Sequence, residues 1–245
     1  MANYTFDTIT EAQALAYNEQ VDTLAFAPGV NANTITVLYI PAAGADPARV
    51  SITVNGVTKI FGTTAPTVGD AGDGVTDGVL GVVMTTTTGS ILYIGNNADV
   101  GGADDNQAGN TGSDGLYGGA GDDVLAAGEG SNFLQGNAGN DTLSAGSSAD
   151  VIYGGQGNDQ ITTGAGNNWV QGNLGNDIIT GGGTTGQSET LVGGQGNDQI
   201  TGGAGNDFIN GNIGTDVLVG GDGADTMLGE TGDDEITGGG GNDSI

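Results

Sequence analysis

The C-terminal part of the chain is a nine-residue repeat that runs from residue 109 to residue 245. Two units are identical, Gly154-Gly-Gln-Gly-Asn-Asp-Gln-Ile-Thr162 and the unit from Gly193 to Thr201, and the general form is Gly-Gly-x-Gly-x-Asp-x-U-x. The U position is aliphatic in every unit, with one three-residue insertion before Leu191: Leu116, Leu125, Leu134, Leu143, Ile152, Ile161, Val170, Ile179, Leu191, Ile200, Ile209, Leu218, Met227, Ile236 and Ile245. Such a register predicts a stack of equivalent short coils around one apolar column.

Charge and composition restrict the partners of the chain. It has 30 acidic residues against two basic ones, Arg49 and Lys59, and both basic residues precede the repeats. Nucleic acid and anionic lipid would repel such a polyanion, so the sequence predicts neither nucleic-acid binding nor membrane insertion. The chain has no cysteine and therefore no disulfide bonds. Bound metal is the candidate for the stabilising cross-links that disulfides provide in other secreted proteins.

The repeat chemistry points to calcium. In each unit the three residues x-U-x suit a short strand with U facing inward, and the six preceding residues suit a turn whose glycines expose backbone carbonyls. Two units make a coil of about 18 residues, and stacked coils about 4.8 Å apart place each turn beside its equivalent. Carboxylate and carbonyl oxygens without His or Cys select calcium, and its binding free energy then becomes folding free energy.

The unit resembles the nonapeptide of the RTX proteins. The resemblance covers residues 109–245 and implies an all-β fold, a right-handed parallel β-roll that is a calcium-stapled β-solenoid. It also implies type I secretion, calcium-triggered folding, and a place in the medium or on the cell surface of a Gram-negative bacterium. The N-terminus lacks a cleaved signal sequence, which suits this route. Because the repeats stop at Ile245 without a polar cap, we expect a roll truncated at its C-terminus.

The residues before the roll predict a small, mostly-β N-terminal domain with one short helix. We assign residues 1–98 to this domain, 99–108 to a linker or degenerate first coil, and 109–245 to the roll. Thr10 caps an expected helix that ends at Tyr17, and Asn55-Gly56 is a hairpin signal between two alternating runs. The other expected strands are Thr23–Ala27, Thr34–Ile40, Val50–Val54, Val57–Phe61, Val79–Thr85 and Ser90–Ile94. The loop from Gly69 to Asp77 suits either one metal ion or, as we favour, a solvated hairpin loop.

Alternate turns fall on opposite sides of the coil, so the Asp position divides into two rows. The intact row is Asp123, Asp141, Asp159, Asp177, Asp198, Asp216 and Asp234. The second row is Asp114, Asn132, Asp150, Asn168, Glu189, Asp207, Asp225 and Asp243, and three of its turns start with Ala127, Ala145 and Thr163 instead of glycine. We expect about six calcium ions in the intact row and about two in the second, mainly at Asp207–Asp243, hence about eight.

A longer period of 36 to 39 residues overlies the nonapeptide. It places Phe133, Trp169 and Phe208 at equivalent points, each followed by a Gly-Asn pair. The strands after the second-row turns carry outward apolar residues: Tyr117, Phe133, Val151, Tyr153, Trp169, Val192, Phe208 and Leu228. This stripe predicts a contact surface for a homo-oligomer or polymer, centred on Phe133, Tyr153, Trp169 and Phe208, or for the N-terminal domain. Scattered surface aromatics are the plain alternative, and a cell-surface glycan is a further partner.

The sequence argues against an enzyme. It has no His or Cys, a single Lys and a single Arg, and no Gly-x-Ser-x-Gly elbow, so the motifs of RTX proteases and lipases are absent. We expect a calcium-dependent, secreted structural protein that self-assembles, similar to bacterial S-layer and filament proteins. The alternative is a secretion and folding module of a larger adhesin or toxin. Ice binding is disfavoured because the third repeat position (Ala120, Ala138, Gln156, Leu174) lacks an aligned Thr or Asn array.

Overall fold

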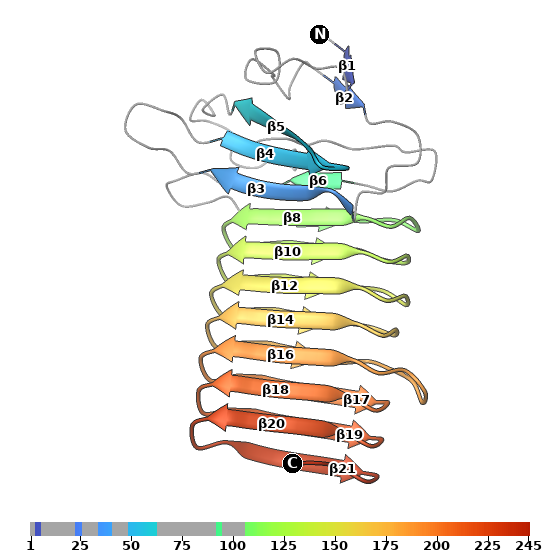
Figure 1. Cartoon of the computed structure of the whole chain (residues 1–245), viewed down its shortest axis with the longest axis vertical. Helices are drawn as coiled ribbons and strands as arrows, with labels where there is room; N and C mark the ends of the chain where they lie inside the picture. The colour runs from blue at the N-terminus through green and yellow to red at the C-terminus, as the bar shows by residue number, and fades with distance from the viewer. Residues whose placement is uncertain (1–2, 6–22, 26–33, 41–48, 63–91, 95–105) are drawn as a thin grey trace.

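The computed structural model describes residues 3–5, 23–25, 34–40, 49–62, 92–94 and 106–245. Residues 106–245, together with 92–94, form a parallel β-solenoid of about eight coils, and a small antiparallel sheet lies at its N-terminal end (Figure 1). This confirms the predicted all-β fold and parallel β-roll. The expected helix at Thr10–Tyr17, the strand at Val79–Thr85 and the loop at Gly69–Asp77 lie outside the described residues.

Two parallel eight-stranded sheets make the solenoid, and successive strands alternate between them. We call the first the aromatic sheet: β6 (Leu92–Ile94), β8 (Gly115–Ala120), β10 (Phe133–Ala138), β12 (Val151–Gln156), β14 (Trp169–Leu174), β16 (Thr190–Gln195), β18 (Phe208–Ile213) and β20 (Thr226–Thr231). We call the second the polar sheet: β7 (Asn106–Ala108), β9 (Val124–Ala126), β11 (Thr142–Ser144), β13 (Gln160–Thr162), β15 (Ile178–Thr180), β17 (Gln199–Ala204), β19 (Val217–Asp222) and β21 (Glu235–Gly240). Each coil therefore contributes one strand to each sheet.

The core is the aliphatic column that the repeat predicts. From Leu116 to Met227 every U side chain is at most 1 % exposed. The parallel register places equivalent residues on top of one another, as with Leu134 between Leu116 and Ile152. Each strand contributes only one aliphatic side chain to the narrow interior. The turns between the strands bury little apolar surface, so an interaction other than the apolar core must stabilise them.

The three-residue insertion leaves this register intact. Val170 pairs with Leu191 across a step of 21 residues instead of 18, and the extra residues lie in the loop between β15 and β16 (Figure 1). Within that loop Gln187 donates its backbone N–H to the carbonyl oxygen of Thr184. The insertion thus enlarges one turn on the second-row side without displacing the strands.

The N-terminal region contributes short strands. β1 (Asn3–Thr5) pairs in parallel with β2 (Thr23–Ala25), and β3 (Thr36–Ile40), β4 (Arg49–Val54) and β5 (Val57–Gly62) form an antiparallel sheet in that order. The β4–β5 turn has positive φ at Asn55 (48°) and Gly56 (78°), which confirms the predicted hairpin.

The first coil of the roll starts earlier in the chain than the nonapeptide does. β6 pairs in parallel with β8, and β7 pairs with β9, so residues 92–94 and 106–108 lie in the two sheets of the solenoid. The sequence grouped residues 92–94 with the N-terminal domain because they lack the Gly/Asp turn. Among the residues that the structure describes, no helix has the length and apolar character to cross a membrane.

Candidate metal centre

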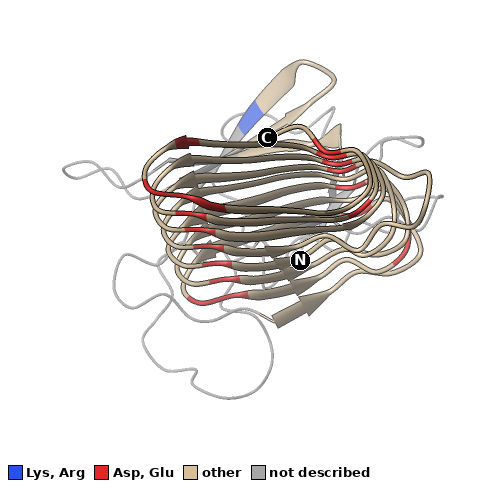
Figure 2. Cartoon of the chain, turned by 90° about the horizontal axis from the view of Figure 1, so that it is seen from below, with Lys and Arg blue, Asp and Glu red and all other residues tan. Residues whose placement is uncertain are grey.

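The sixth-position side chains of the repeat are buried in two rows at opposite edges of the solenoid (Figure 2). From Asp114 to Asp225 each of them is at most 3 % exposed, whereas Asp234 and Asp243 in the last coil are half-buried. The sixth and eighth positions are two residues apart, so they face the same side of the extended chain. When the aliphatic side chain at the eighth position turns inward, the sixth side chain turns inward as well. Buried carboxylates are unfavourable unless hydrogen bonds or a cation compensate them.

One oxygen of each intact-row carboxylate is held by a backbone ladder. The N–H of Asp141 donates to Oδ1 of Asp159 at 2.8 Å, and the N–H of Asp159 donates in the same way to Asp177, also at 2.8 Å. The same bond links every consecutive pair from Asp123 to Asp234. The ladder fixes the orientation of each carboxylate and directs its second oxygen into the turn.

In both rows, most of the carboxylates have a second oxygen that is buried and accepts no hydrogen bond. Residues with such an oxygen are Asp141, Asp150, Asp159, Asp177, Glu189, Asp198, Asp207, Asp216 and Asp225. A stacked series of this kind is rare, because nearly all buried polar atoms in folded proteins have a partner. The series indicates a ligand that the protein oxygens share.

In the intact row, the first glycine of each turn leaves room for that ligand. A Cβ added to Gly154 would collide with Oδ2 of Asp159 and lie 2.7 Å from the carbonyl oxygen of Gly172 in the next coil. Equivalent pairs of a carboxylate and a next-coil carbonyl surround Gly118, Gly136, Gly172 and Gly193. A carboxylate and a carbonyl oxygen that converge between coils, with no side chain between them, fit the oxygen ligation of calcium.

Burial raises the pKa of these carboxylates. Desolvation raises the pKa of Asp159 to about 8, and the charges of Asp141 and Asp177 above and below add to the effect. Desolvation likewise raises the pKa of Asp198 to about 7 and that of Asp141 to about 6. Without a cation the rows are electrostatically unfavourable at neutral pH, and a divalent ion between coils would offset the repulsion.

The carboxylates do not form a conventional acidic cluster. Within the described residues, no group of three or more Asp or Glu side chains converges on one point. Each coil offers one carboxylate to a row, so backbone carbonyls of the glycine turns would have to supply most of the oxygens at any calcium site. The glycines are therefore as much a part of the site as the Asp residues.

A family comparison agrees with this geometry. The model of the RTX calcium-binding nonapeptide repeat matches residues 99–134, 126–161, 153–184, 183–218 and 219–245, which together span more than half of the chain. The chain belongs to the RTX repeat family. RTX repeats bind calcium, and RTX proteins are typically secreted. No curated protein matches the chain.

In the second row of the RTX roll, three turns have lost the space between coils. Ala127, Ala145 and Thr163 replace the first glycine, and Ala127 and Thr163 are fully buried, so their side chains occupy the region that glycine leaves open elsewhere. Asn132 compensates within its turn, where its Nδ2 donates to the carbonyl oxygens of Gly130 (2.9 Å) and Gly128 (3.3 Å). The amide N–H groups of Asn132 thus occupy carbonyls that would be free to bind calcium in an intact turn.

The enlarged turn holds a polar network that the sequence analysis missed. Thr163 Oγ1 and Asn168 Nδ2 each donate to Oε1 of Glu189 at 2.7 Å. The second row has the same backbone ladder on either side of this point, where the N–H of Asp150 donates to Asn168 and the N–H of Glu189 donates to Asp207. Between Asn168 and Glu189, the Asn168 side chain makes the contact. The sequence did contain a signal for this network: close to the one insertion, Thr163 replaces a glycine of the repeat, and Asn168 and Glu189 replace its Asp.

The remaining second-row residues divide at Glu189. Before it, Asp114 uses its second oxygen to accept the N–H of Asn110 at 2.8 Å, and Asp150 lies in the turn that starts with Ala145. After it, Asp207 and Asp225 regain the glycine pattern, with the carbonyls of Gly220 and Gly238 opposite. A carboxylate and a next-coil carbonyl also face each other around Gly109 (Asp114) and Gly181 (Glu189), so the two sites expected at Asp207–Asp243 stay a prediction.

A second ladder, also missed from the sequence, supports the intact row from outside. The fifth-position Asn140 accepts the N–H of Asn158 on its Oδ1 at 2.8 Å, and Asn158 accepts the N–H of Asn176 at 2.7 Å. The side chains are exposed, so the ladder ties neighbouring turns together without competing for the buried oxygens. The Gly-Asn-Asp sequence of the intact turns encodes both ladders.

Proposed function

We propose that this RTX protein is a secreted structural protein whose roll closes only when calcium binds outside the cell. The observation that carries the proposal is the series of buried carboxylate oxygens without a hydrogen-bond partner, most of which face a carbonyl of the next coil. Extracellular calcium modules bind at about 10⁻⁴ to 10⁻³ M, well above the range of cytosolic sensors. The roll would therefore stay open during synthesis and close after export, for which the family suggests type I secretion.

Circular dichroism tests the calcium step directly. In chelator we expect residues 106–245 to be disordered, and on calcium addition the β signal should rise cooperatively and saturate at about eight bound ions. Magnesium at the same concentration should give much less signal, because it requires tighter octahedral geometry than a flexible carbonyl turn provides. A β signal that chelation leaves unchanged would disprove calcium-triggered folding.

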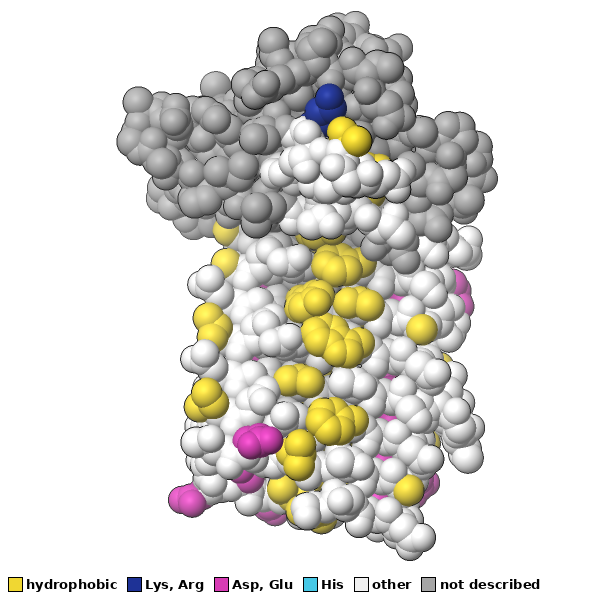
Figure 3. Space-filling model, viewed as in Figure 1, with side chains coloured by type: hydrophobic (Ala, Val, Ile, Leu, Met, Phe, Trp, Pro, Cys, Tyr) yellow, Lys and Arg dark blue, Asp and Glu magenta, His cyan; other side chains and the backbone are white. Residues whose placement is uncertain are grey.

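We further propose that the folded roll self-associates as an S-layer, filament or matrix component. The aromatic sheet carries a column of apolar side chains along its outer face (Figure 3), and within the predicted stripe Val151 (36 % exposed), Phe208 (36 % exposed) and Leu228 (38 % exposed) are open to solvent. Exposed apolar columns of this extent usually mark contact surfaces. We propose no catalytic role, since the chain lacks His and Cys and carries its acidic groups in calcium turns.

Light scattering with calcium tests the assembly. The double variant Phe208→Glu with Leu228→Glu should remain a monomer while the parent forms larger species. Val124→Glu is the matched control, because Val124 is 41 % exposed but lies on the polar sheet. A calcium-folded parent that stays monomeric would reject assembly and favour the alternative, an RTX folding module that serves a larger adhesin or toxin.

A further inference from the structure

The outer face of the aromatic sheet has its own period of two coils. Every second strand presents an aromatic residue, an amide and an asparagine at equivalent positions: Phe133-Gln135-Asn137, Trp169-Gln171-Asn173 and Phe208-Asn210-Asn212. In the strands between them glycine replaces the asparagine, so Asn137 pairs with Gly155, and Gly155 with Asn173. Neither the core nor the calcium rows require this alternation.

The asparagines occupy a backbone conformation that favours glycine. The φ angles are 81° at Asn137, 84° at Asn173 and 73° at Asn212, and the equivalent Gly155 and Gly194 also have positive φ. A side chain at such a position is unfavourable for folding, although Asn tolerates it better than most residues. Its recurrence three times on one face indicates that the amide side chains have a role other than stability.

The amides line a pocket of about 380 Å³ whose floor includes Gly155, between Asn137 and Asn173. Gln135 donates its Nε2 to Oδ1 of Asn137 at 2.7 Å, and Nδ2 of Asn137 is buried without a hydrogen-bond partner. Asn137, which lines the pocket, therefore has a donor group that no described residue satisfies.

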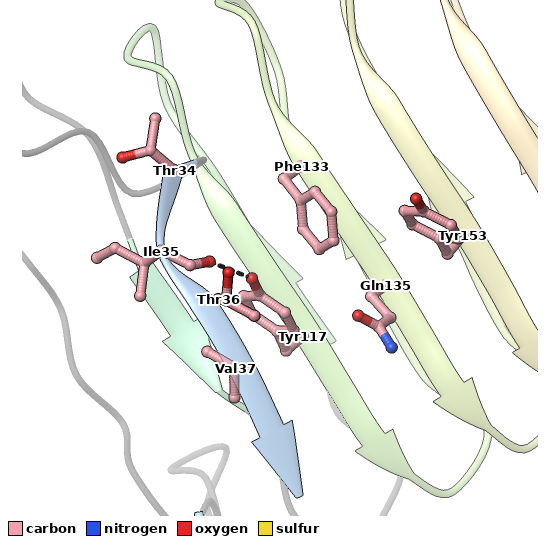
Figure 4. Close-up of a pocket in the computed structure, with 8 residues that line it drawn as sticks. All are labelled: Thr34, Ile35, Thr36, Val37, Tyr117, Phe133, Gln135 and Tyr153. Carbon is pink, nitrogen blue, oxygen red and sulfur yellow. Dashed lines mark hydrogen bonds between the residues drawn. The ribbon is translucent and has the colours of Figure 1, made fainter. Parts of the chain in front are cut away.

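A row of aromatic rings lies on the same strands as these amides. The ring centroids of Tyr117, Phe133, Tyr153 and Trp169 follow one another at 5.3, 5.7 and 4.9 Å. A second pocket of about 300 Å³ lies where Tyr117, Phe133 and Tyr153 approach β3, and Gln135 lines both pockets (Figure 4). Tyr117 is anchored there, since its hydroxyl donates to the carbonyl oxygen of Ile35 at 2.5 Å. The two pockets form one surface of rings and amides.

We propose that this surface binds a neutral, β-1,4-linked polysaccharide that runs along the solenoid axis. Aromatic rings pack on the C–H faces of pyranose units, and amides exchange hydrogen bonds with their hydroxyl groups. The triplets recur every two strand spacings, about 9.6 Å, which is comparable to the disaccharide repeat of a flat β-1,4 chain. The triplets carry no charge, and a net charge of −28 on the whole chain disfavours an anionic polysaccharide.

Binding of short sugars tests the proposal. The probes are β-1,4-linked hexaoses of glucose and of N-acetylglucosamine, with cellobiose and polygalacturonate as the short and the charged comparison, all in calorimetry with saturating calcium. We expect at least one hexaose to bind, and cellobiose and polygalacturonate to bind at least tenfold more weakly. The double variant Asn137→Gly with Asn173→Gly should lose at least tenfold in affinity while folding normally, because glycine is the residue of the alternate strands.

The controls separate this proposal from calcium-dependent folding, on which it rests because the face exists only in the closed roll. Circular dichroism first establishes that each protein is folded in calcium. Gln160→Ala with Gln199→Ala removes two exposed amides from the polar sheet and should leave sugar affinity unchanged. If neither hexaose binds the folded protein, or the Asn→Gly variant binds as well as the parent, the proposal fails. Since self-association is proposed for the apolar column of this face, the amides distinguish the two proposals. The sugar proposal also fails if the Asn→Gly variant loses self-association in the absence of sugar, because the amides then belong to the contact between copies.

Discussion

At the scale of single residues, the calcium turns depend on the missing side chain of the first glycine as much as on the carboxylate of the Asp. Gly154 does not need glycine for its φ angle, because its backbone is not in the left-handed region. It needs glycine because Oδ2 of Asp159 and the carbonyl of Gly172 face the place where a Cβ would lie. The second row shows the consequence, since Ala127 fills that place and Asn132 then hydrogen-bonds the carbonyls itself.

We therefore expect Gly154→Ala to remove a calcium ion although it changes no ligand. The added methyl group should destabilise the calcium-bound roll by about 1–3 kcal/mol, the usual cost of overpacking, and lower the calcium count by one or two. Urea unfolding in calcium and a calcium titration measure the two effects. The reverse change Ala145→Gly, beside Asp150, is the control and should not lower the count. An unchanged count in Gly154→Ala would contradict a role for the glycine space.

At the scale of strands and turns, the repeat predicted the features that depend only on one nonapeptide and its equivalents in the neighbouring coils. The aliphatic column, the alternation of the two sheets and the two Asp rows follow from nine residues at a time, because each unit pairs only with its equivalent in the next coil. Contacts that cross units were not predictable in this way. The Thr163–Asn168–Glu189 network depends on how a three-residue insertion is accommodated, and β6 joins the roll with no nonapeptide of its own.

The contact between the roll and the N-terminal sheet was likewise not predictable from the repeat. The sequence identified Tyr117 as part of an outward apolar stripe, and the structure finds it only 2 % exposed, with its hydroxyl on the Ile35 carbonyl beside β3. Burial there raises the pKa of the Tyr117 hydroxyl well above its usual range. Tertiary packing of a non-repeated segment against a repeated face leaves no periodic signal, so the covered end of the stripe could not be told from its open end.

At the scale of the whole molecule, burial of a thin apolar column favours folding, and repulsion and desolvation in two rows of stacked carboxylates oppose it. The column runs through every coil, but it contributes one aliphatic side chain per strand. The rows place buried carboxylates at successive strand spacings, and desolvation raises the pKa of several of them. Anything that neutralises the rows favours the closed roll, and calcium and protons are the two agents available.

Protons should accordingly replace part of the calcium effect. The pKa values of about 6 for Asp141, about 7 for Asp198 and about 8 for Asp159 in the roll lie above the usual value near 3.9 for an unfolded Asp. The calcium-free roll thus binds more protons than the unfolded chain, and its stability is present below about pH 4 and lost as pH rises through about 6 to 8. In chelator, circular dichroism should show more β structure at pH 5 than at pH 8.

In calcium the dependence should reverse, because protons compete with the ion for the same carboxylates. The calcium concentration at the folding midpoint should therefore be higher at pH 5 than at pH 8. Asp159→Asn supplies the control: it removes the carboxylate with the highest of these pKa values, so the chelator profile should lose its most alkaline part. More structure at pH 8 than at pH 5 in chelator would show that the buried rows do not oppose folding, and the calcium dependence would then need another cause.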